Sequence, residues 1–523
     1  MIRLKSWVYG AWHEGGGKLA TLVNPATEEV LGEASSEGVD FARVHEHARG
    51  KGLPALSSMS WADRALMLKN VARLFHSHRE ALLDLAQQNG GNTRGDAKFD
   101  IDGAIGTLGA YASLGESLAA RLGDRKFILD GEMAQLTRAP RFGGQHLWVP
   151  RKGVAVHVNA FNFPAWGTFE KAAVAWLAGA PIVSKPATAT ALVAFRMAEL
   201  LAESGLVPEG GFQLVCGSAG DLLSRLGAQD SLAFTGSNGT GAMLRHTPGF
   251  AERGVRVNVE ADSLNAVVIG PDAEIGGELW STAVRHVVTD MTQKTGQKCT
   301  AIRRVAVPES LVGEFEEAVV EALGAHTVGN PLVDGVTVGP VATAQQLRDV
   351  TAGIRAVAAN GRVVLGGPER VDGRGSEAGK GYFVAPTVIR LDGAGPGPVH
   401  DIEVFGPSVS ILPYDGSAAE GANFLARGQG SLVSTAYSDD RAWIGQMIAD
   451  GAPWLGRFML VSSKVADQVT APGMVLPSCV HGGPGRAGGG EELGNERGLQ
   501  FYMQRTALQG DRVVLGKILG IEA

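Results

Sequence analysis

Cys299 is the residue whose type and position most favour chemistry in this chain. It ends the run Gln293-Lys294-Thr295-Gly296-Gln297-Lys298-Cys299, between a predicted helix over 279–291 and a predicted strand over 303–307. The helix is indicated by apolar residues at helical spacing, and Gly296 is a suitable residue to stop it. A lone cysteine is more often a small buried hydrophobe, but a thiol on a short connector between packed elements is placed to act as a nucleophile.

Two polar residues follow other predicted strands. Glu260 ends the alternating strand 255–259, which we take to be central in its sheet, and Asn162 lies on the turn after the strand 153–158. Because ligands of parallel sheets bind at the carboxyl ends of strands, we expect Glu260 and Asn162 to face one cleft. An ion-paired surface glutamate and an ordinary turn amide are the competing interpretations.

A nucleotide-binding signal lies in Phe234-Thr235-Gly236-Ser237-Asn238-Gly239-Thr240-Gly241, directly after a strand and opening a helix. Glycines allow close approach to a pyrophosphate, and free N–H groups at a helix N-terminus bind it. A literal G-x-G-x-x-G at 483–488 is followed by more glycine and no predicted helix, so we interpret it as a flexible loop. Lys185 ends another strand and is placed to hold a ribose or a phosphate.

Strand-like and helix-like runs alternate from 153 to 270, which predicts a parallel α/β sheet covered by helices. A second α/β region follows, with helices over 309–323 and 344–360. The stretch 134–152 predicts a projecting hairpin turning at Gly143-Gly144. The strands are predicted over 153–158, 181–184, 212–216, 231–235, 255–259 and 265–269, and the helices over 168–177, 190–204, 219–226 and 239–246.

Length and composition exclude several classes of protein. The chain has 523 residues, enough for two or three domains, and its net charge of -7 argues against a nucleic-acid or membrane surface as partner. The longest mostly apolar stretch, 172–183, is too short to span a bilayer. Three scattered cysteines, Cys216, Cys299 and Cys479, predict neither a disulfide framework nor a metal site and fit a cytoplasmic location.

Taken together, these segments resemble the aldehyde dehydrogenase superfamily over roughly residues 20 to 510. The matching pieces occur in the family's order: Phe161-Asn162-Phe163-Pro164, Lys185-Pro186, Phe234-Thr235-Gly236-Ser237 with Gly241, Glu260, Gly296-Gln297-Lys298-Cys299, and Glu403-Val404-Phe405-Gly406-Pro407. The tail with Gly-Gly-Gly-Glu-Glu-Leu-Gly at 488–494 resembles the branch that acts on coenzyme A semialdehydes from aromatic ring cleavage.

The resemblance implies three catalytic roles. Cys299 would attack the aldehyde carbon as a thiolate, so its pKa must be lowered or a base must help. Asn162 would stabilise the oxyanion with the Cys299 backbone N–H, and Glu260 would deprotonate the water that hydrolyses the thioester. Glu170, Lys171 and Glu496 are further groups that would help protons leave, although a structural salt-bridge role is at least as frequent.

The resemblance also implies a nicotinamide cofactor. Lys185 would reach the adenosine ribose or its phosphate, Glu403 the nicotinamide ribose, and Phe405 would pack beside the ring, with Gly236, Ser237 and Gly241 near the pyrophosphate. Many NAD-using members carry Glu three residues after the lysine, whereas this chain has Thr188. Since Thr can donate to a 2′-phosphate that Glu would repel, we expect NADP, with NAD also possible.

The expected architecture has three parts: a Rossmann-like cofactor domain (1–126 and 148–260), a catalytic domain (261–480) and a small β oligomerisation arm (127–147 and 499–523). The arm implies a homodimer or a homotetramer. Three other functions stay open: a general aldehyde dehydrogenase for aliphatic or aromatic aldehydes, a cysteine hydrolase with His286 as partner, and a non-catalytic binding protein.

Overall fold

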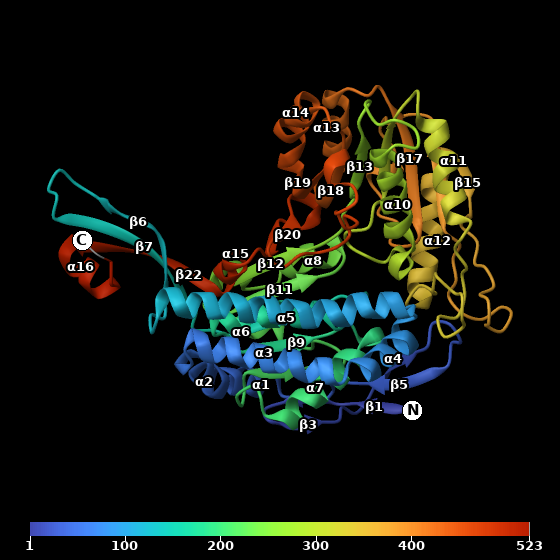
Figure 1. Cartoon of the computed structure of the whole chain (residues 1–523). Coiled ribbons are helices and arrows are strands. Elements are labelled where there is room, and N and C mark those ends of the chain that lie inside the picture. Colours follow the sequence, from blue (N-terminus) through green and yellow to red (C-terminus); the bar gives the residue numbers. More distant parts are fainter. Residues whose placement is uncertain (522–523) are drawn as a thin grey trace.

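The computed structural model describes residues 1–521 and contains two large α/β sheets that face each other across a cleft (Figure 1). The first has the strand order β12-β11-β8-β9-β10-β2-β3, in which β12 to β10 run parallel. Its strands are β12 (Arg256–Glu260), β11 (Ser231–Thr235), β8 (Ala155–Val158), β9 (Ile182–Lys185), β10 (Phe212–Leu214), β2 (Ser6–Val8) and β3 (Ala11–His13).

Helices cover both faces of this sheet. Helix α6 is mostly apolar and is buried on nearly all sides between the sheet and other helices, and its Phe169 and Trp176 are fully buried. Ser60 and Thr93 form capping boxes that start α3 and α5. The helices are α1 (Phe41–His47), α2 (Leu53–Ser58), α3 (Trp61–Ser77), α4 (Arg79–Gly90), α5 (Arg94–Leu122), α6 (Trp166–Ala178), α7 (Leu192–Ser204), α8 (Asn238–Arg245) and α9 (Phe250–Arg253).

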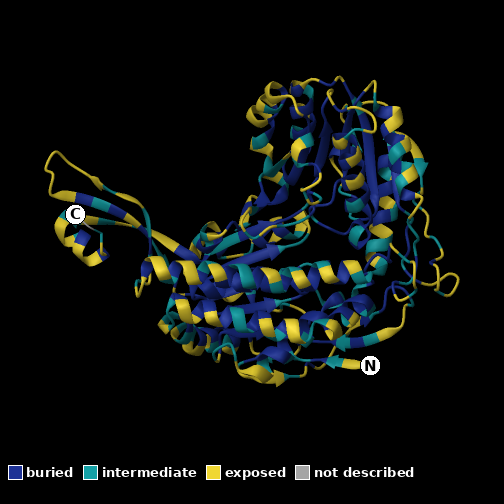
Figure 2. Cartoon of the chain, viewed as in Figure 1, coloured by how far each residue is buried: buried dark blue, intermediate teal, exposed yellow. Residues whose placement is uncertain are grey.

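The second sheet carries the order β15-β16-β17-β14-β13-β18-β19, parallel except for β15. Burial is concentrated in the strands and the sheet-facing sides of the helices (Figure 2). The strands are β13 (Ala266–Ile269), β14 (Arg304–Pro308), β15 (Gly361–Leu365), β16 (Thr387–Leu391), β17 (Ser408–Tyr414), β18 (Ser431–Tyr437) and β19 (Leu455–Val461); the helices are α10 (Glu278–Thr292), α11 (Val312–Leu323), α12 (Ala344–Ala358), α13 (Ala418–Ala426) and α14 (Arg441–Gly451).

A three-stranded arm, β22-β7-β6, projects away from both sheets and carries α16 (Figure 1). Its elements are β6 (Ile128–Gln135), β7 (Phe142–Pro150), β22 (Met503–Asp511) and α16 (Arg512–Leu519). The predicted hairpin is present, but its turn is not at Gly143-Gly144. Both glycines lie inside β7, where a Cβ would collide with Arg512 or Leu136, so they make room for neighbouring side chains. Residues 522–523 of the predicted arm lie outside the described residues.

Two other expectations are wrong. Residues 219–226 form only a short 3-10 turn, Leu223–Arg225, because Gly217 and Gly220 adopt left-handed backbone angles that interrupt a helix. Strand β12 lies at the edge of its sheet. Its free side is covered by the hairpin β20 (Val480–Gly483) and β21 (Gly490–Leu493), to which the Asn258 side chain is hydrogen-bonded.

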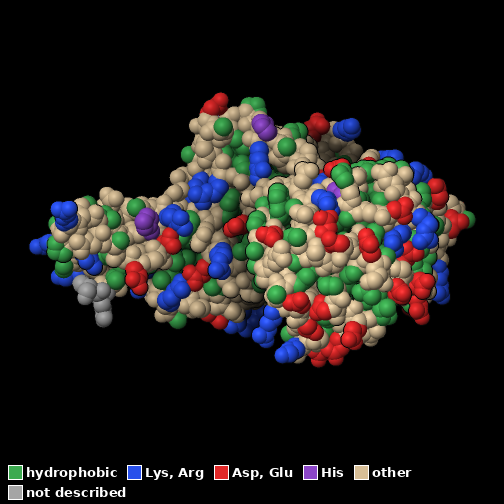
Figure 3. Space-filling view, turned by 90° about the horizontal axis from the view of Figure 1, so that it is seen from above, with side chains coloured by type: hydrophobic (Ala, Val, Ile, Leu, Met, Phe, Trp, Pro, Cys, Tyr) green, Lys and Arg blue, Asp and Glu red, His purple; other side chains and the backbone are tan. Residues whose placement is uncertain are grey.

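Smaller elements complete the fold. Strands β1 (Ile2–Leu4), β5 (Val30–Ala34) and β4 (Ala20–Val23) form a small sheet near the N-terminus, and α15 (Glu496–Leu499) follows β21. Acidic and basic side chains are interspersed on the face seen in Figure 3. None of the helices found within residues 1–521 is long and apolar enough to cross a membrane.

Candidate active site

Cys299, Glu260 and Asn162 line one small pocket between the two sheets. The Cys299 sulfur lies within 4.8 Å of a Glu260 carboxylate oxygen and of a ring nitrogen of His481. Glu260 is the last residue of β12 and Asn162 follows β8, so the carboxyl ends of two strands supply both side chains. The three residues that the sequence singled out for chemistry are therefore neighbours.

An unusual backbone loop presents Cys299 to this pocket. Helix α10 ends at Thr292, and Lys294, Thr295 and Gly296 follow with φ angles of 53°, 56° and 67°. Left-handed angles are costly for residues with a Cβ, and the surrounding structure must enforce them. At Gly296 a Cβ would lie 2.1 Å from the Gly406 carbonyl oxygen, so only glycine fits.

Buried polar side chains hold this loop in place. The Arg303 guanidinium donates to the carbonyl oxygens of Gly296 (2.9 Å) and Lys298 (3.0 Å), and the Asn265 amide donates to that of Cys299 (2.8 Å). Lys298 forms a fully buried ion pair with Asp290 at 2.7 Å. Sequence reasoning did not single out these residues. A charged residue, Arg303, next to a buried strand was the feature of the sequence that could have indicated this buried polar network.

Asn162 is oriented by the same loop. Its Nδ2 donates to the Gln297 carbonyl oxygen at 3.0 Å. An amide nitrogen carries two hydrogens, so the second can be donated to an oxyanion that forms beside Cys299.

The electrostatics of the pocket keep the proton on sulfur. Burial, together with the Glu260 and Glu403 carboxylates, raises the pKa of Cys299 well above its usual value. Burial alone would raise the pKa of Glu260 too, but the nearby charges of His481 and Lys171 outweigh it and lower that pKa to about 2. Of the two alternatives that the sequence left open, a lowered thiol pKa or an assisting base, the structure favours the base.

His481 is the main residue of the pocket that sequence reasoning missed. It is fully buried on β20, its Nε2 lies 3.1 Å from Glu260 Oε2, and its ring packs edge-on against Trp166. The G-x-G-x-x-G run that follows it is a tightly packed hairpin rather than a flexible loop, since a Cβ on Gly488 would collide with the Val259 backbone.

A buried ion cluster lies behind Glu260. The Lys171 ammonium is 2.5 Å from Glu170 and 3.3 Å from Glu492, and these carboxylates raise its pKa despite burial. Burial likewise raises the pKa of Glu170. Glu496, which the resemblance grouped with Glu170 and Lys171, instead pairs with Arg121 at 2.8 Å outside this cluster, and Glu492 takes its place.

A cavity of about 660 Å³ opens on one side of Cys299. Gly236, Ser237, Glu403 and Phe405 all line it, as expected for residues that hold a cofactor. Burial raises the pKa of Glu403 to about 7 despite the nearby Arg303 guanidinium. The volume of this cavity is within the range of cofactor sites. Ser237 also caps the N-terminus of α8 at this cavity.

Three predicted cofactor residues do not line this cavity. Lys185 ends β9, and burial lowers its pKa. The Thr188 hydroxyl donates to the Gly217 carbonyl oxygen at 3.3 Å, and Gly241 packs against Val259, where a Cβ would lie 2.7 Å from a methyl carbon. Gly241 thus allows close packing of α8 on β12.

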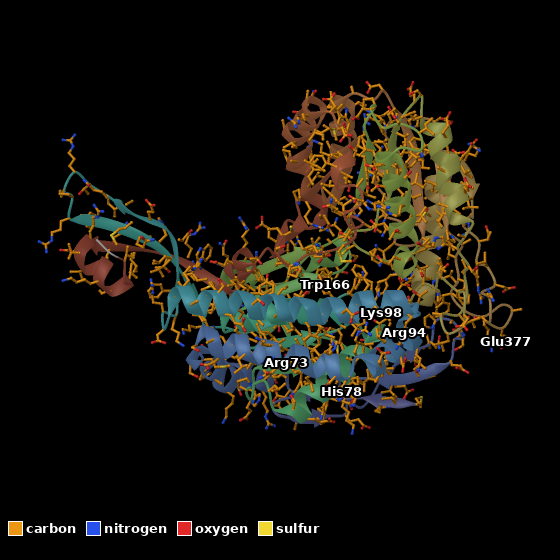
Figure 4. The ribbon with its side chains drawn as sticks, viewed as in Figure 1. Arg73, His78, Arg94, Lys98, Trp166 and Glu377 are labelled. Atoms are coloured by element: carbon orange, nitrogen blue, oxygen red, sulfur yellow. The ribbon has the colours of Figure 1, made fainter. Side chains whose placement is uncertain are left out.

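A second, mostly apolar cavity of about 520 Å³ reaches Cys299 from the other side. Residues of α5, several of them small, form one wall. Figure 4 labels Lys98 on this helix and, at the start of α6, Trp166, whose ring nitrogen donates to Thr107 of α5. A glycine inside a helix lowers the stability of the helix by about 1 kcal/mol relative to alanine. Three glycines on this wall therefore indicate that the cavity needs the space that larger side chains would fill. The wall residues from α5 are Gly95, Lys98, Phe99, Asp102, Gly103, Gly106, Thr107 and Ala110.

His286, the partner considered for a cysteine hydrolase, is hydrogen-bonded to the Tyr437 hydroxyl at 2.7 Å and lines neither cavity. The nucleophile thus lies between a polar cavity with nucleotide-binding features and an apolar one.

Comparisons with known proteins agree with this arrangement. The model of the aldehyde dehydrogenase family matches residues 12–507. The 3,4-dehydroadipyl-CoA semialdehyde dehydrogenase of Aromatoleum evansii is 42% identical over 92% of this chain and 93% of its own length. A putative aldehyde dehydrogenase of Staphylococcus saprophyticus is 31% identical over 79% of this chain and 81% of its own length.

Solved structures show the same fold at lower identity. The betaine aldehyde dehydrogenase of Staphylococcus aureus in complex with NAD+ has a TM-score of 0.83 at 23% identity, with 97% of this chain and 95% of that one covered. An NADP-dependent enzyme of Escherichia coli has a TM-score of 0.82 at 24% identity, covering 97% and 98%. The predicted α/β fold is thereby confirmed. The chain belongs to the aldehyde dehydrogenase family and is an oxidoreductase that acts on aldehydes.

Proposed function

We propose that this enzyme oxidises a coenzyme A-linked semialdehyde, 3,4-dehydroadipyl-CoA semialdehyde, to the carboxylic acid during the breakdown of aromatic compounds such as benzoate. The observation that carries the chemistry is Cys299 between the two cavities, with Glu260 within 4.8 Å of its sulfur. The relative from Aromatoleum evansii supports the choice of substrate.

The proposed reaction begins at Cys299. Its thiol gives its proton to the ionised Glu260, and the sulfur attacks the aldehyde carbon that arrives through the apolar cavity. The resulting oxyanion accepts a hydrogen bond from Asn162 Nδ2; one such donor is typically worth about 3–4 kcal/mol. A nicotinamide cofactor held beside Glu403 and Phe405 would supply the acceptor for the hydride, and loss of that hydride leaves a thioester on Cys299.

The Lys171 cluster offers a route by which the first proton leaves Glu260 for solvent, so that Glu260 can act a second time. This cluster adjoins two small cavities of about 10 Å³, each close to the size that one water needs. Glu260 then accepts a proton from the water that attacks the thioester, which releases the acid and the Cys299 thiolate, and it returns this proton to the sulfur to restore the thiol.

We propose NADP as the preferred cofactor, because Thr188 offers no carboxylate that would repel a 2′-phosphate. Glu403 would accept hydrogen bonds from the nicotinamide ribose, Phe405 would pack beside the ring, and Gly236 and Ser237 would lie near the pyrophosphate. Lys185 would turn toward the adenosine end. The first sheet and its helices would then be the cofactor domain, and the second the catalytic domain.

The apolar cavity favours a long substrate. At Gly106 a Cβ would contact nothing within 4 Å, so this position is open. A pantetheine arm has the narrow, extended shape that such a glycine wall accommodates. We also propose a cytoplasmic, homo-oligomeric enzyme whose arm (127–147 and 499–523) forms subunit contacts.

Steady-state kinetics with two substrates and two cofactors test this proposal. We expect kcat/KM to be higher for the coenzyme A-linked semialdehyde than for the free semialdehyde, and higher with NADP than with NAD. Gly106→Leu should reduce kcat/KM for the linked substrate more than for the free one, while Gly109→Leu, outside the cavity wall, should not. Equal kcat/KM for the linked and the free semialdehyde would refute the proposed substrate. Equal kcat/KM with NADP and with NAD would refute the proposed cofactor preference.

A further inference from the structure

The pocket around Cys299 contains donor atoms of three chemical kinds. The sulfur of Cys299, a ring nitrogen of His481 and a carboxylate oxygen of Glu260 lie within 4.8 Å of one another, and Glu260 Oε2 is 3.1 Å from His481 Nε2. Thiolate, imidazole and carboxylate are the ligands that zinc prefers in proteins. With bonds of about 2.0–2.3 Å, a tetrahedral ion separates its ligand atoms by about 3–4 Å, so small side-chain adjustments suffice.

The Glu260 and His481 side chains have few polar partners beyond one another. Among residues 1–521, the Glu260 oxygens and the His481 ring nitrogens have no partner in hydrogen-bond geometry apart from the 3.1 Å pairing of Oε2 with Nε2, and both side chains are almost completely buried. Buried polar groups are normally satisfied, and an unsatisfied one points to a ligand, a water or an ion. The inward-facing atoms of two different side chains are therefore available for the same ligand.

A buried cluster of carboxyl groups adjoins these donor atoms. The carboxyl groups of Glu170, Glu260 and Glu492 also lie within 4.8 Å of one another, and the Lys171 ammonium is the positive group paired with them. Carboxyl groups thus outnumber the ammonium in this cluster, which offsets part of the repulsion that Lys171 exerts on a divalent ion.

We propose that Cys299, His481 and Glu260 form a binding site for a thiophilic divalent cation of the zinc class, and that its binding inhibits the enzyme. On binding, the S–H bond of Cys299 and the N–H bond at the ligating nitrogen of His481 break, their protons leave to water, and sulfur–metal and nitrogen–metal bonds form without redox change. Water completes the coordination. The ion occupies the sulfur lone pair that attacks the aldehyde and the carboxylate that accepts the proton, so turnover stops until a chelator removes it.

Inhibition rests on the proposed role of Cys299, whereas metal binding does not. Binding is therefore measured without turnover, by titrating the full-length protein with Co²⁺ and recording the near-ultraviolet thiolate-to-metal absorption band, and with Zn²⁺ by calorimetry. We expect one site per chain in wild type, with loss of the band in Cys299→Ser. A wild-type protein that shows neither the band nor calorimetric binding would overturn the proposal.

The matched variants are His481→Phe and Cys479→Ser. Phenylalanine preserves a ring against Trp166 and removes one ligand. Loss of even an outer-shell partner typically weakens metal affinity about 10–100-fold, so the Zn²⁺ concentration for half-inhibition should rise more than about 10-fold in His481→Phe. Cys479→Ser removes the exposed thiol two residues away and should respond to Zn²⁺ as wild type does.

Glu260→Gln provides an independent readout if His481→Phe does not fold. Its Co²⁺ affinity should fall more than about 10-fold, measured by the same absorption band. Unchanged Zn²⁺ sensitivity in a folded His481→Phe, or loss of binding in Cys479→Ser, would contradict the site. A wild type that binds Co²⁺ through Cys299 and yet turns over at full rate would instead contradict the proposed nucleophile.

Discussion

The reactivity of Cys299 depends on its neighbours more than on the cysteine itself. Burial and the carboxylates of Glu260 and Glu403 raise its pKa, so the resting side chain is a thiol that needs a base. The sequence allowed Cys299, Glu260 and Asn162 to be chosen, because each follows a recognisable element. It could not reveal the protonation state, which depends on contacts between residues far apart in the chain, such as Glu260 and His481.

The proposed role of Glu403 at the nicotinamide ribose predicts that cofactor binding depends on pH. The Glu403 pKa of about 7 means that this side chain is mostly protonated below that pH and a carboxylate above it. A carboxylate accepts stronger hydrogen bonds from ribose hydroxyls than a neutral acid does. The KM for the cofactor should therefore fall as the pH rises through about 7.

Steady-state titration of the cofactor at several pH values measures this effect. In Glu403→Gln the side chain is neutral at every pH, so the step in KM near pH 7 should vanish. A step of the same size in wild type and variant would show that another group is responsible.

The regular elements were predictable because their patterns are local. Helix α10, strand β11 and most of the alternation over 153–270 follow from apolar spacing and differ from the structure by a few residues at their ends; the helix predicted over 219–226 is the exception. The errors arose where long-range packing decides. The glycines of β7 serve neighbouring side chains, and β12 is an edge strand because the C-terminal hairpin covers it.

The loop between α10 and Cys299 should not tolerate change at Gly296. In Gly296→Ala the new Cβ would lie 2.1 Å from the Gly406 carbonyl oxygen, on a residue with φ of +67°. We expect a loss of at least about 1 kcal/mol in the free energy of unfolding and a strong fall in kcat, because the loop that carries the thiol must move.

Gly109→Ala is the control for this substitution. Gly109 lies inside α5 with nothing within 4 Å of its Cβ position, so alanine should keep or raise stability by about 1 kcal/mol. Denaturant unfolding and kcat measure both variants. A Gly296→Ala enzyme with wild-type stability and kcat would contradict this description of the loop.

At the scale of the whole molecule, the arm is the part least explained by a single chain. Its sheet projects from the body, and α16 presents Val513, Val514 and Ile518 with exposed fractions of 44%, 51% and 68%. Exposed apolar side chains grouped on one helix are typical of an interface. The proposal that the arm makes subunit contacts came from the family resemblance, since a short hairpin in the sequence does not indicate what it contacts.

We therefore expect Val514→Asp combined with Ile518→Asp to shift the enzyme to a smaller assembly in light scattering. Val30→Asp, at an equally exposed valine on β5, is the control and should leave the mass unchanged. A double variant with the wild-type mass would exclude α16 from the interface.

The pairing of a cysteine nucleophile with Glu260 as base is tested most directly by rapid-mixing kinetics of Glu260→Gln. Absorbance of the reduced cofactor should still show an initial burst of about one equivalent per active site, but the burst should form more slowly than in wild type, because Cys299 must then give its proton to water instead of Glu260. Steady turnover should fall by about 10²–10⁴-fold, the usual contribution of a general base. Cys299→Ala should show neither phase. A Glu260→Gln enzyme that turns over at the wild-type rate, or a burst that persists in Cys299→Ala, would contradict the account.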